Sequence, residues 1–426
     1  MTIQKSSVSR RAFLKKSAVA TSVIAAPTII SASALGAKSG TVPPSDRIVM
    51  GGIGVGRRGS YVLSEFLKYP QLQFVADADC QLSRRQQVKA MVDKHYDNED
   101  CVIVRDMFDV LDRPDIDVVL IATGDRWHTM ASITAARAGK DIYCEKPCSM
   151  TIQESRALAD VVNLHGRVYQ AGTQRRSIGN FQLAIEMAQT GKLGKLTEVH
   201  ANTLAPGVSQ EWLPAEPTPN ADVCDWDRWL GPCPWRPYNE HYVQGRWRGH
   251  YDFHGGGILE WGAHTVDLCQ LANRADDTAP VEYVPNATGV DCMYANGVKL
   301  VMRKDGWLGL GTCSVRFVGE DGFVETGDSG AMQVEPESLL AEKKVFKMRG
   351  TSAFTHVGNF LDCVKSRSLT RSNASVAGQS HIACHAAYIA WQLGRKLTFD
   401  PVKEEFVGDE EANRMRSRAT RVPWTV

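Results

Sequence analysis

The chain has 426 residues, of which 43% are hydrophobic and 23% are charged, and this is the length and composition of a globular protein with room for two hydrophobic cores. Its 49 basic and 48 acidic side chains leave a formal net charge of +1, which gives no reason to expect nucleic acid or an anionic membrane surface as a partner. Beyond the N-terminus, no apolar run reaches the length of a membrane span, so no membrane partner is expected.

The first 34 residues have the order of segments that is typical of a twin-arginine export signal. Arg10 and Arg11 lie in the sequence SRRAFLK, an apolar stretch follows at 18–30, and Ala32-Ser33-Ala34 suits a signal peptidase. We therefore exclude residues 1–34 from the fold and expect the protein in the periplasm. The resemblance to substrates of that pathway implies export in the folded state.

Cysteine usage gives little sign of disulfides or of a metal. The eleven cysteines are an odd number, and they show neither a CxxC pair nor Cys/His ligand spacing. Folding in a reducing compartment before export would leave most of them as buried small hydrophobic side chains. The sequence predicts no structural metal.

The chain then enters a pattern typical of a dinucleotide-binding domain, which we place at residues 35–174. Residues 47–53 predict a buried strand, and the sequence GVGRRG follows at the turn into a helix expected at 60–69. In such a turn the first glycine permits the tight bend, the second lets the backbone approach a pyrophosphate, and the third lets the helix pack closely on the strand. The helix N-terminus then faces phosphate. The loop residues expected at the cofactor are Gly54, Gly56, Arg57, Arg58 and Gly59.

A second strand, expected at 72–76, ends at Asp77. An acid about 20 residues beyond the glycine turn accepts hydrogen bonds from the adenosine ribose hydroxyls. Its charge would repel a 2′-phosphate, which favours NAD over NADP. Arg84 and Arg85 lie nearby and arginine can accommodate that phosphate, so NADP stays an alternative.

Further short apolar strands alternate with helical segments up to residue 174. The strands are expected at 102–104, 117–122, 141–144 and 167–171, with helices such as 129–139 and 152–165 between them. This alternation predicts a doubly wound parallel (Rossmann) sheet, whose ligands bind at the carboxyl ends of the strands. The residues expected there are Thr123 and His128 after the fourth strand, Glu145 and Lys146 after the fifth, and Gln174 after the last.

Residues 175–400 predict a second, α+β domain. Later apolar runs are joined by glycine-containing turns without helices between them, which indicates a large, mostly antiparallel open sheet. Its strands are expected at 196–204, 289–294, 298–303, 308–317 and 322–326. Helices are expected at 181–190, 353–367 and 381–397. The charged residues 401–426 are expected to form a C-terminal arm.

The connection between the two parts of this second domain is rich in tryptophan. Six of the ten tryptophans fall between residues 205 and 261, namely Trp212, Trp226, Trp229, Trp235, Trp247 and Trp261. Flat aromatic faces suit sugar rings, but the same rings could simply pack a long loop against its domain. Both interpretations stay open.

The segment GGGILEWGAHTVD, at 255–267, sets a carboxylate and an imidazole one helical turn apart. On a helix, Glu260 and His264 lie on the same face, so they can share one substrate. Removing hydride from a secondary alcohol requires a base within hydrogen-bond reach of the hydroxyl. His264, whose ordinary pKa is about 6.5, is the expected base, and Lys146 is expected to stabilise the developing alkoxide. Glu260 would orient the hydroxyl or the imidazole.

Together with Glu145-Lys146-Pro147, the stretch from Ala122 to His128 and Ala138-Gly139-Lys140, these motifs resemble the Gfo/Idh/MocA (glucose-fructose oxidoreductase, inositol dehydrogenase) family in its exported members. The resemblance covers essentially everything after the signal. It implies that Lys146 reaches the substrate hydroxyl and the nicotinamide, that Glu145 touches the nicotinamide ribose, and that His264 accepts the proton. Many members carry aspartate where this chain has Glu260. The resemblance also implies that the open sheet mediates a homo-oligomer, a dimer or a tetramer.

The sequence thus predicts an NAD(P)-dependent oxidoreductase acting on a secondary hydroxyl of a sugar, glycoside or cyclitol. Free NAD is scarce outside the cytoplasm, so the cofactor is expected to be tightly bound and regenerated on the enzyme. The alternative is NAD-dependent glycoside cleavage by oxidation, elimination and re-reduction. Lys146 favours the plain oxidoreductase over this alternative. A noncatalytic sugar-binding protein is a third hypothesis, but it would leave the glycine loop, Lys146 and His264 idle.

Overall fold

The computed structural model describes residues 42–340, 350 and 352–424. The segment that ends at Arg47, with the short helix η1 (Pro44–Asp46), is a unit of its own, and residues 48–426 form the other unit. Both β-sheets belong to this second unit. The predicted export signal lies outside the described residues.

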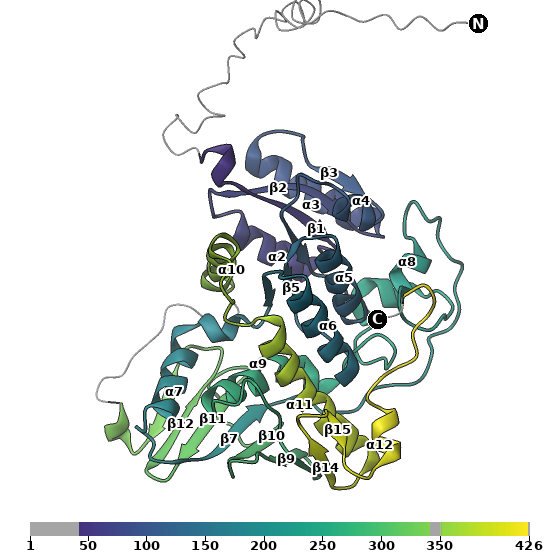
Figure 1. The fold of residues 1–426 in the computed structure, drawn as a ribbon. Helices are drawn as coiled ribbons and strands as arrows, with labels where there is room; N and C mark the ends of the chain where they lie inside the picture. The colour runs from purple at the N-terminus through teal and green to yellow at the C-terminus, as the bar shows by residue number, and fades with distance from the viewer. Residues whose placement is uncertain (1–41, 341–349, 351, 425–426) are drawn as a thin grey trace, which may run out of the picture. The chain divides into compact units, whose positions relative to one another are not determined.

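The first sheet is the predicted parallel one (Figure 1). Its strands are β1 (Ile48–Ile53), β2 (Leu72–Ala78), β3 (Val102–Val104), β4 (Val118–Ile121), β5 (Asp141–Cys144) and β6 (Tyr169–Ala171). They lie in the order β3-β2-β1-β4-β5-β6, and every pair is parallel. The strand order reverses between β1 and β4, and such a reversal opens a crevice at the carboxyl ends of the strands. The doubly wound fold is therefore confirmed.

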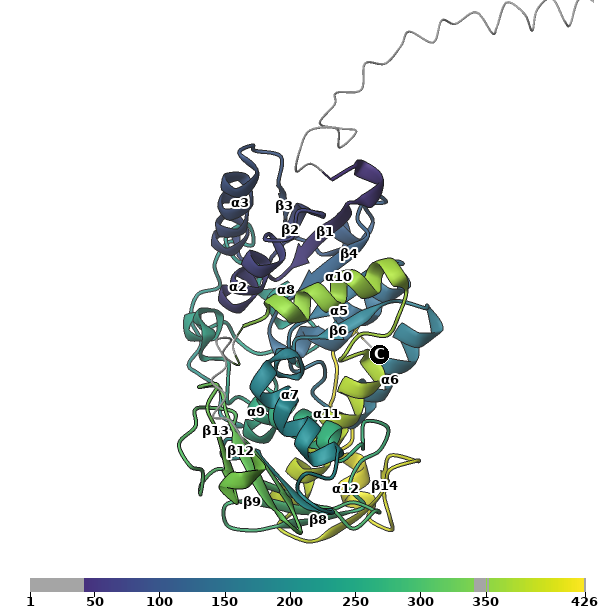
Figure 2. The same ribbon diagram turned by 90° about the vertical axis from the view of Figure 1, so that its left-hand side faces the viewer.

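Helices cover this sheet, and one of them comes from the far end of the chain. The sequential helices are α2 (Arg57–Phe66), α3 (Leu82–Tyr96), α4 (Phe108–Leu111), α5 (Asp125–Arg137) and α6 (Ile152–Leu164). Helix α10 (Phe354–Ser366) lies beside α2 (Figure 2), where Phe360 and Phe66 pack edge to face with centroids 6.1 Å apart. The core of the parallel-sheet half is thus closed by residues more than 280 positions downstream of α2.

The second sheet has nine strands in the order β13-β12-β11-β7-β10-β9-β8-β14-β15. The strands are β7 (Leu196–Asn202), β8 (Glu282–Pro285), β9 (Gly289–Met293), β10 (Lys299–Arg303), β11 (Val315–Gly319), β12 (Gly322–Thr326), β13 (Met332–Glu335), β14 (Leu397–Asp400) and β15 (Glu405–Phe406). Only β7 and β10 pair in parallel, so the sheet is mostly antiparallel, as predicted. Helices α7 (Gly179–Gln189), α9 (Gly257–Ala272) and α11 (Ala374–Leu393) cover one of its faces.

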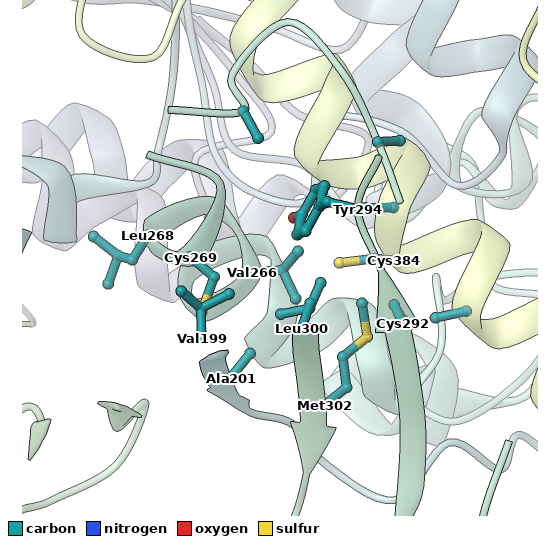
Figure 3. Close-up of a cluster of buried hydrophobic side chains, with 14 of the residues drawn as sticks. Val199, Ala201, Val266, Leu268, Cys269, Cys292, Tyr294, Leu300, Met302 and Cys384 are labelled. Carbon is teal, nitrogen blue, oxygen red and sulfur yellow. The ribbon is translucent and has the colours of Figure 1, made fainter. Parts of the chain in front are cut away.

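Figure 3 shows the core between this sheet and its helices. Val199 and Leu300 project from β7 and β10 toward Val266 and Cys269 of α9, and Cys384 of α11 joins them. Fully burying one such aliphatic side chain contributes about 1.5–3 kcal/mol. This packing fixes α9, and α9 carries Glu260 and His264.

The structure departs from several predicted bounds. β11 begins only at Val315, because Gly309 and Gly311 adopt φ values of 75° and 110° that break a strand. Helix α11 ends at Leu393, where Gly394 with φ 64° caps it, so residue 397 lies in a strand. Strands β8, β13, β14 and β15 are not predicted. β15 brings part of the predicted C-terminal arm into the sheet.

All eleven cysteines are free, and ten of them are buried, which agrees with the expectation that most are buried small hydrophobic side chains. Among the described residues, no helix has both the length and the apolar character that crossing a membrane requires.

Candidate active site

The glycine turn between β1 and α2 has the geometry that a phosphate-binding loop needs. Gly54 has φ +65°, and a Cβ there would lie 2.3 Å from Cγ2 of Thr123. A Cβ on Gly59 would lie 2.7 Å from Cβ of Ala122, so this glycine allows the helix to approach the sheet. Nothing lies within 4 Å of the position that a Cβ on Gly56 would take. No side chain caps the start of α2, so its first N–H groups are available to an anion.

A cavity of about 790 Å³ opens at this turn, and this volume suits a small-molecule or cofactor site. The predicted residues that line it are Gly54, Gly56, Arg57, Arg58 and Thr123. Its other walls include Asp79 and Arg84 after β2, and Trp247 and Arg248 from the long connection in the second half. These residues fit a dinucleotide, because they combine open N–H groups, cationic side chains and an acid at the end of the second strand.

The prediction for Asp77 needs correction, because this residue does not line the cavity. β2 extends two residues beyond its predicted end and pairs Asp77 with Gly52 of β1. The carboxyl of Asp77 is fully buried and has no hydrogen-bond partner, and burial raises its pKa well above the ordinary value. Asp79 lies at the cavity instead. It is the acid available to a ribose.

Two other predicted cofactor residues lie behind the cavity wall. The Nδ1 atom of His128 lies 2.6 Å from the backbone oxygen of Pro147, so this ring ties helix α5 to the Glu-Lys-Pro loop. Burial lowers the pKa of His128. Gln174 is 2% exposed and donates to the backbone oxygen of Gly350. Both side chains support the site from behind, and neither lines the cavity.

Glu145 and Lys146 follow directly after β5, at the carboxyl end of the sheet. Arg58 of the glycine turn donates from Nε to Oε1 of Glu145 at 3.1 Å. Lys146 donates from Nζ to the backbone oxygen of Glu260 at 2.8 Å and to its Oε1 at 3.1 Å. The loop after β5 therefore joins the glycine turn to the first turn of α9.

Glu260 is held as a carboxylate by several donors. Burial alone would raise its pKa, but the charge of Lys146, the hydrogen bond from His254 and the charge of Arg248 together lower it below the ordinary value. His254 lies 3.1 Å from Oε2 of Glu260 through its Nε2 atom. The Nδ1 atom of the same ring accepts the N–H of Gly256, so Nε2 carries the proton that Glu260 accepts. Glu260 thus holds the Lys146 ammonium, as a positioning carboxylate would.

His264 lies one turn further along α9 and is 5% exposed. Burial lowers its pKa well below the ordinary value, and the positive charges of Arg175, Lys146 and Arg58 lower it further. Its Nδ1 atom is buried without a hydrogen-bond partner. The imidazole is therefore neutral at pH 7 and able to accept a proton.

Two buried arginines that the sequence did not single out hold this region together. Arg176 makes a double hydrogen bond to Asp267 of α9, with Nε–Oδ2 2.6 Å and Nη2–Oδ1 2.9 Å. Arg175 does the same with Asp328, at 2.8 and 2.6 Å. Asp267 stands three residues beyond His264, on the same helical face, and this spacing is the only sequence signal for the pair.

Asp125, His254 and Glu260 bring three potential metal-ligand atoms within 4.8 Å of one another. These atoms already have partners, because the N–H of Gly255 donates to Asp125 Oδ2 at 3.2 Å and Lys146 binds Glu260. A cation would have to displace the Nε2 proton of His254 and would face the Lys146 ammonium. The donor set therefore favours a hydrogen-bonded network, and we infer no metal site here.

Five of the six tryptophans between residues 205 and 261 divide into two groups, and the sixth, Trp261, is half-buried on α9. Trp226, Trp229 and Trp247 are buried in one aromatic cluster with Tyr242 and Phe253. This cluster packs the connection, and Trp229 and Trp247 also line the cavity. Trp212 and Trp235 are 54% and 60% exposed. Loop packing thus accounts for the buried group.

The C-terminal arm reaches the cavity as well. Arg421 donates from Nη2 to the backbone oxygens of Asp227 and Gly231, beside helix α8 (Trp226–Leu230). Trp424 packs edge to face on Trp127 of α5, with centroids 4.8 Å apart, and lines the cavity. The arm therefore packs on its own chain.

The parallel sheet with its glycine turn and cavity, followed by the nine-stranded sheet, defines a two-part fold with a candidate nucleotide site. The model "Oxidoreductase family, NAD-binding Rossmann fold" matches residues 48–173, and "Oxidoreductase family, C-terminal alpha/beta domain" matches residues 207–426. The chain belongs to the Gfo/Idh/MocA oxidoreductase family.

Relatives with stated activities share part of this chain. Levoglucosan dehydrogenase of Pseudarthrobacter phenanthrenivorans is 35% identical over 24% of this chain and 25% of its own length. The NAD(+)-dependent scyllo-inositol 2-dehydrogenase of Bacillus subtilis is 31% identical over 34% of this chain and 40% of its own length. The alignments thus span less than half of these relatives.

Among solved structures, the fold is similar to that of the WlbA dehydrogenase from Bordetella pertussis in complex with NADH and UDP-GlcNAcA. The TM-score is 0.60 at 16% identity, and the match covers 83% of this chain and 99% of the other. At 16% identity, the similarity shows a shared fold alone.

Proposed function

We propose that this protein transfers hydride between a secondary hydroxyl of a sugar, glycoside or cyclitol and a nicotinamide dinucleotide held in the cavity at the glycine turn. The observation that carries the proposal is the contact between Lys146 after β5 and Glu260 of α9. It brings an ammonium from the nucleotide-binding half to the helix that carries His264. When bound, the nicotinamide supplies the hydride acceptor or donor.

Two arginines connect the cavity with the catalytic cluster, which consists of Lys146, Glu260 and His264. Lys146, Glu260 and His264 are not among the residues that line the cavity. Arg58 lines it and donates to Glu145, and Arg248 lines it with Nε 3.9 Å from Oε1 of Glu260. The cluster therefore lies at the end of the cavity where β4 and β5 terminate, and nicotinamide chemistry is expected at that end.

Each reacting group has a distinct task. The lowered pKa keeps the His264 imidazole neutral, so it has an unprotonated ring nitrogen at which the hydroxyl proton can be taken up as hydride leaves the carbon. The Lys146 ammonium stabilises the alkoxide that develops on the oxygen. Glu260 keeps this ammonium in place through its Oε1 atom and its backbone oxygen.

The charges around the cluster favour a neutral, hydroxyl-rich substrate. Lys146 and Arg248 face Glu260, Arg175 is paired with Asp328, and Arg58 is paired with Glu145. Among the described residues of this cluster, each of these cations has a carboxylate within 4 Å. Two of the relatives act on such compounds by name, levoglucosan and scyllo-inositol.

The cofactor is proposed to be NAD, with NADP as the alternative, and to be tightly bound. Asp79 at the cavity would repel a 2′-phosphate, whereas Arg57 and Arg84 in the same lining would attract it. The aromatic cluster and Trp424 wall the cavity, and this supports slow release.

The deciding experiment is mass spectrometry of the nucleotide that denaturation releases from purified protein, followed by a screen for keto products from sugars and cyclitols. Bound NAD(H) and a keto product support the proposal. Release of p-nitrophenol from a p-nitrophenyl glycoside without net NADH would instead support cleavage by oxidation, elimination and re-reduction. Protein that binds neither NAD(H) nor NADP(H) would refute both routes.

We further propose that the chain is exported to the periplasm through its twin-arginine segment. The support is the N-terminal sequence around Arg10 and Arg11. Replacing both arginines by lysine should keep the protein in the cytoplasm on cell fractionation. Unchanged export of this variant would contradict the proposal.

A homo-oligomer, dimer or tetramer, is proposed to form on the nine-stranded sheet. The support is the position of α7, α9 and α11, which cover one face of the sheet and leave its opposite face as the candidate interface. Light scattering coupled to size-exclusion chromatography tests this. A monomer at micromolar concentration would contradict it.

A further inference from the structure

Arg126, in the first turn of α5, is a buried cation without an anionic partner. Its side chain is buried, its Cζ lies 3.5 Å from the centroid of the Trp229 ring, and its Nε donates to the backbone oxygen of Trp229 at 2.6 Å. Its Nη1 atom is buried and makes no hydrogen bond. Burial lowers its pKa. Desolvating a cation in this way is unfavourable unless a counter-charge compensates.

The nearest carboxylates do not supply that counter-charge. Asp125 accepts the N–H of Gly255, and Asp79 accepts the N–H of Gln81. Both act on Arg126 only through their longer-range charge. Within the described part of the chain, no carboxylate forms an ion pair with this guanidinium.

The guanidinium belongs to the cavity wall. Arg126 lines the cavity together with Gly56 and Arg58 of the glycine turn and with Asp79. It folds back over residue 124, where an added Cβ would lie 2.3 Å from its Nη1 atom. Glycine at position 124 therefore leaves room for the guanidinium beside the start of α5.

We propose that Arg126 is a phosphate-binding residue of the dinucleotide site, and that its free Nη1 donates to the pyrophosphate of the bound cofactor. A guanidinium already fixed by stacking loses little freedom when it binds a phosphate. Asp79 follows β2 and Arg126 follows β4, so in the strand order the glycine turn after β1, where the pyrophosphate is expected, lies between them. This inference rests on the proposed function, since it presupposes a dinucleotide.

The phosphate that Arg126 would bind can come from either of two parts of a dinucleotide. The pyrophosphate is common to NAD and NADP, whereas the 2′-phosphate belongs to NADP alone. Asp79 lines the same wall and would repel a 2′-phosphate, so the geometry points to the pyrophosphate.

The test is calorimetric titration of full-length protein that has been freed of nucleotide by dialysis against charcoal, with NADH, NADPH, ADP-ribose and adenosine as probes. Arg126→Met should weaken NADH and ADP-ribose by about 10- to 100-fold and leave adenosine within about twofold. Arg126→Lys keeps the charge but loses the planar guanidinium, so its affinities for NADH and ADP-ribose should lie between those of Arg126→Met and those of wild type. The thermal unfolding midpoint of each variant shows that it is folded.

Arg113→Met is the matched control. Arg113 is not among the residues that line the cavity and is already paired with Asp115 at 2.6 Å, so its loss should leave all four affinities unchanged. Equal affinity of folded Arg126→Met and wild type for ADP-ribose would overturn the inference. So would a loss confined to NADPH. If wild type itself binds none of the dinucleotides, the proposed function fails and not this residue's role alone.

Discussion

The ammonium of Lys146 and the first turn of α9 are joined by two hydrogen bonds, from Nζ to the backbone oxygen of Glu260 at 2.8 Å and to its Oε1 at 3.1 Å. Both side chains are largely buried, with exposed fractions of 16% and 19%. The contact joins residues 114 positions apart, from different halves of the fold. It fixes the distance between the sheet that ends at the cofactor cavity and the helix that carries the proposed base.

His254 should act on turnover through Glu260. His254→Phe removes the donor to Oε2, and loss of one donor to a buried carboxylate costs about 1–3 kcal/mol, which corresponds to a decrease in kcat of roughly 5- to 150-fold. His254→Gln retains an N–H donor and should restore most of the rate. The measurement is single-turnover reduction of bound NAD by an active sugar. Equal rates in the two variants would show that the imidazole is not needed as a donor.

Cofactor affinity should fall as the pH drops through about 6. Burial raises the pKa of Asp79 to about 6, so the carboxylate that accepts ribose hydroxyls is lost below that pH. Arg84 and Arg85, which face it, stay charged, so they do not produce the change. NADH fluorescence titrations should show up to tenfold weaker binding per pH unit below the pKa. Asp79→Asn should bind weakly at every pH.

Asp77→Asn is the control for this pH dependence. The Asp77 carboxyl is buried and does not line the cavity, so its replacement should leave the inflection in NADH binding in place. If the inflection vanishes with Asp77 and survives the loss of Asp79, the reassignment of the ribose acid is wrong.

Gly54→Ala should destabilise the fold and abolish nucleotide binding. The new Cβ would meet Thr123 at 2.3 Å in a backbone conformation of φ +65°, and strain of each kind costs about 1–3 kcal/mol. Gly139→Ala is the matched variant, because Gly139 has φ +79° with nothing within 4 Å. The Gly139→Ala variant should lower the unfolding midpoint only by the cost of placing alanine in this backbone conformation. Equal unfolding midpoints for the two variants would contradict the close approach at Thr123.

Trp424→Ala should speed the release of bound nucleotide while leaving hydride transfer unchanged. Trp424 lines the cavity and packs on Trp127, so its removal opens one wall without touching Lys146 or His264. Release is measured by chasing bound NADH with excess NAD. Leu164→Ala, at a residue 81% exposed and distant from the cavity lining, should release NADH like wild type. Unchanged release from the tryptophan variant would show that the arm does not retain the cofactor.

Local patterns in the sequence predicted most of the fold and half of the site. The glycine turn, the strand end at Lys146 and the four-residue spacing of Glu260 and His264 are short-range signals. In the structure the glycine turn lines the cavity, and Lys146 is hydrogen-bonded to Glu260 of the helix that carries His264. Asp77 was misplaced because the end of β2 depends on its pairing with β1, and a shift of two residues keeps the same strand face.

The remaining site residues depend on contacts between distant segments. His254 meets Glu260 only because the glycines at 255 and 256 turn the chain back onto α9, and Arg176 meets Asp267 across 91 positions. Arg126 is recognised by its missing partner, which only a packed structure reveals. No periodicity or spacing in a single sequence reports such pairs.

The most direct test of the central claim follows the hydride itself. Purified protein is loaded with NAD and mixed with sugars or cyclitols that are deuterated at their carbinol carbons. The protein is then denatured, and the mass of the released nucleotide is measured by mass spectrometry. The proposed function predicts deuterated NADH with wild type, and its loss in His264→Ala and Lys146→Met variants that still carry NAD. Deuterium transfer that persists in both variants, or a fully loaded wild type that never gains deuterium from any member of the panel, would contradict it.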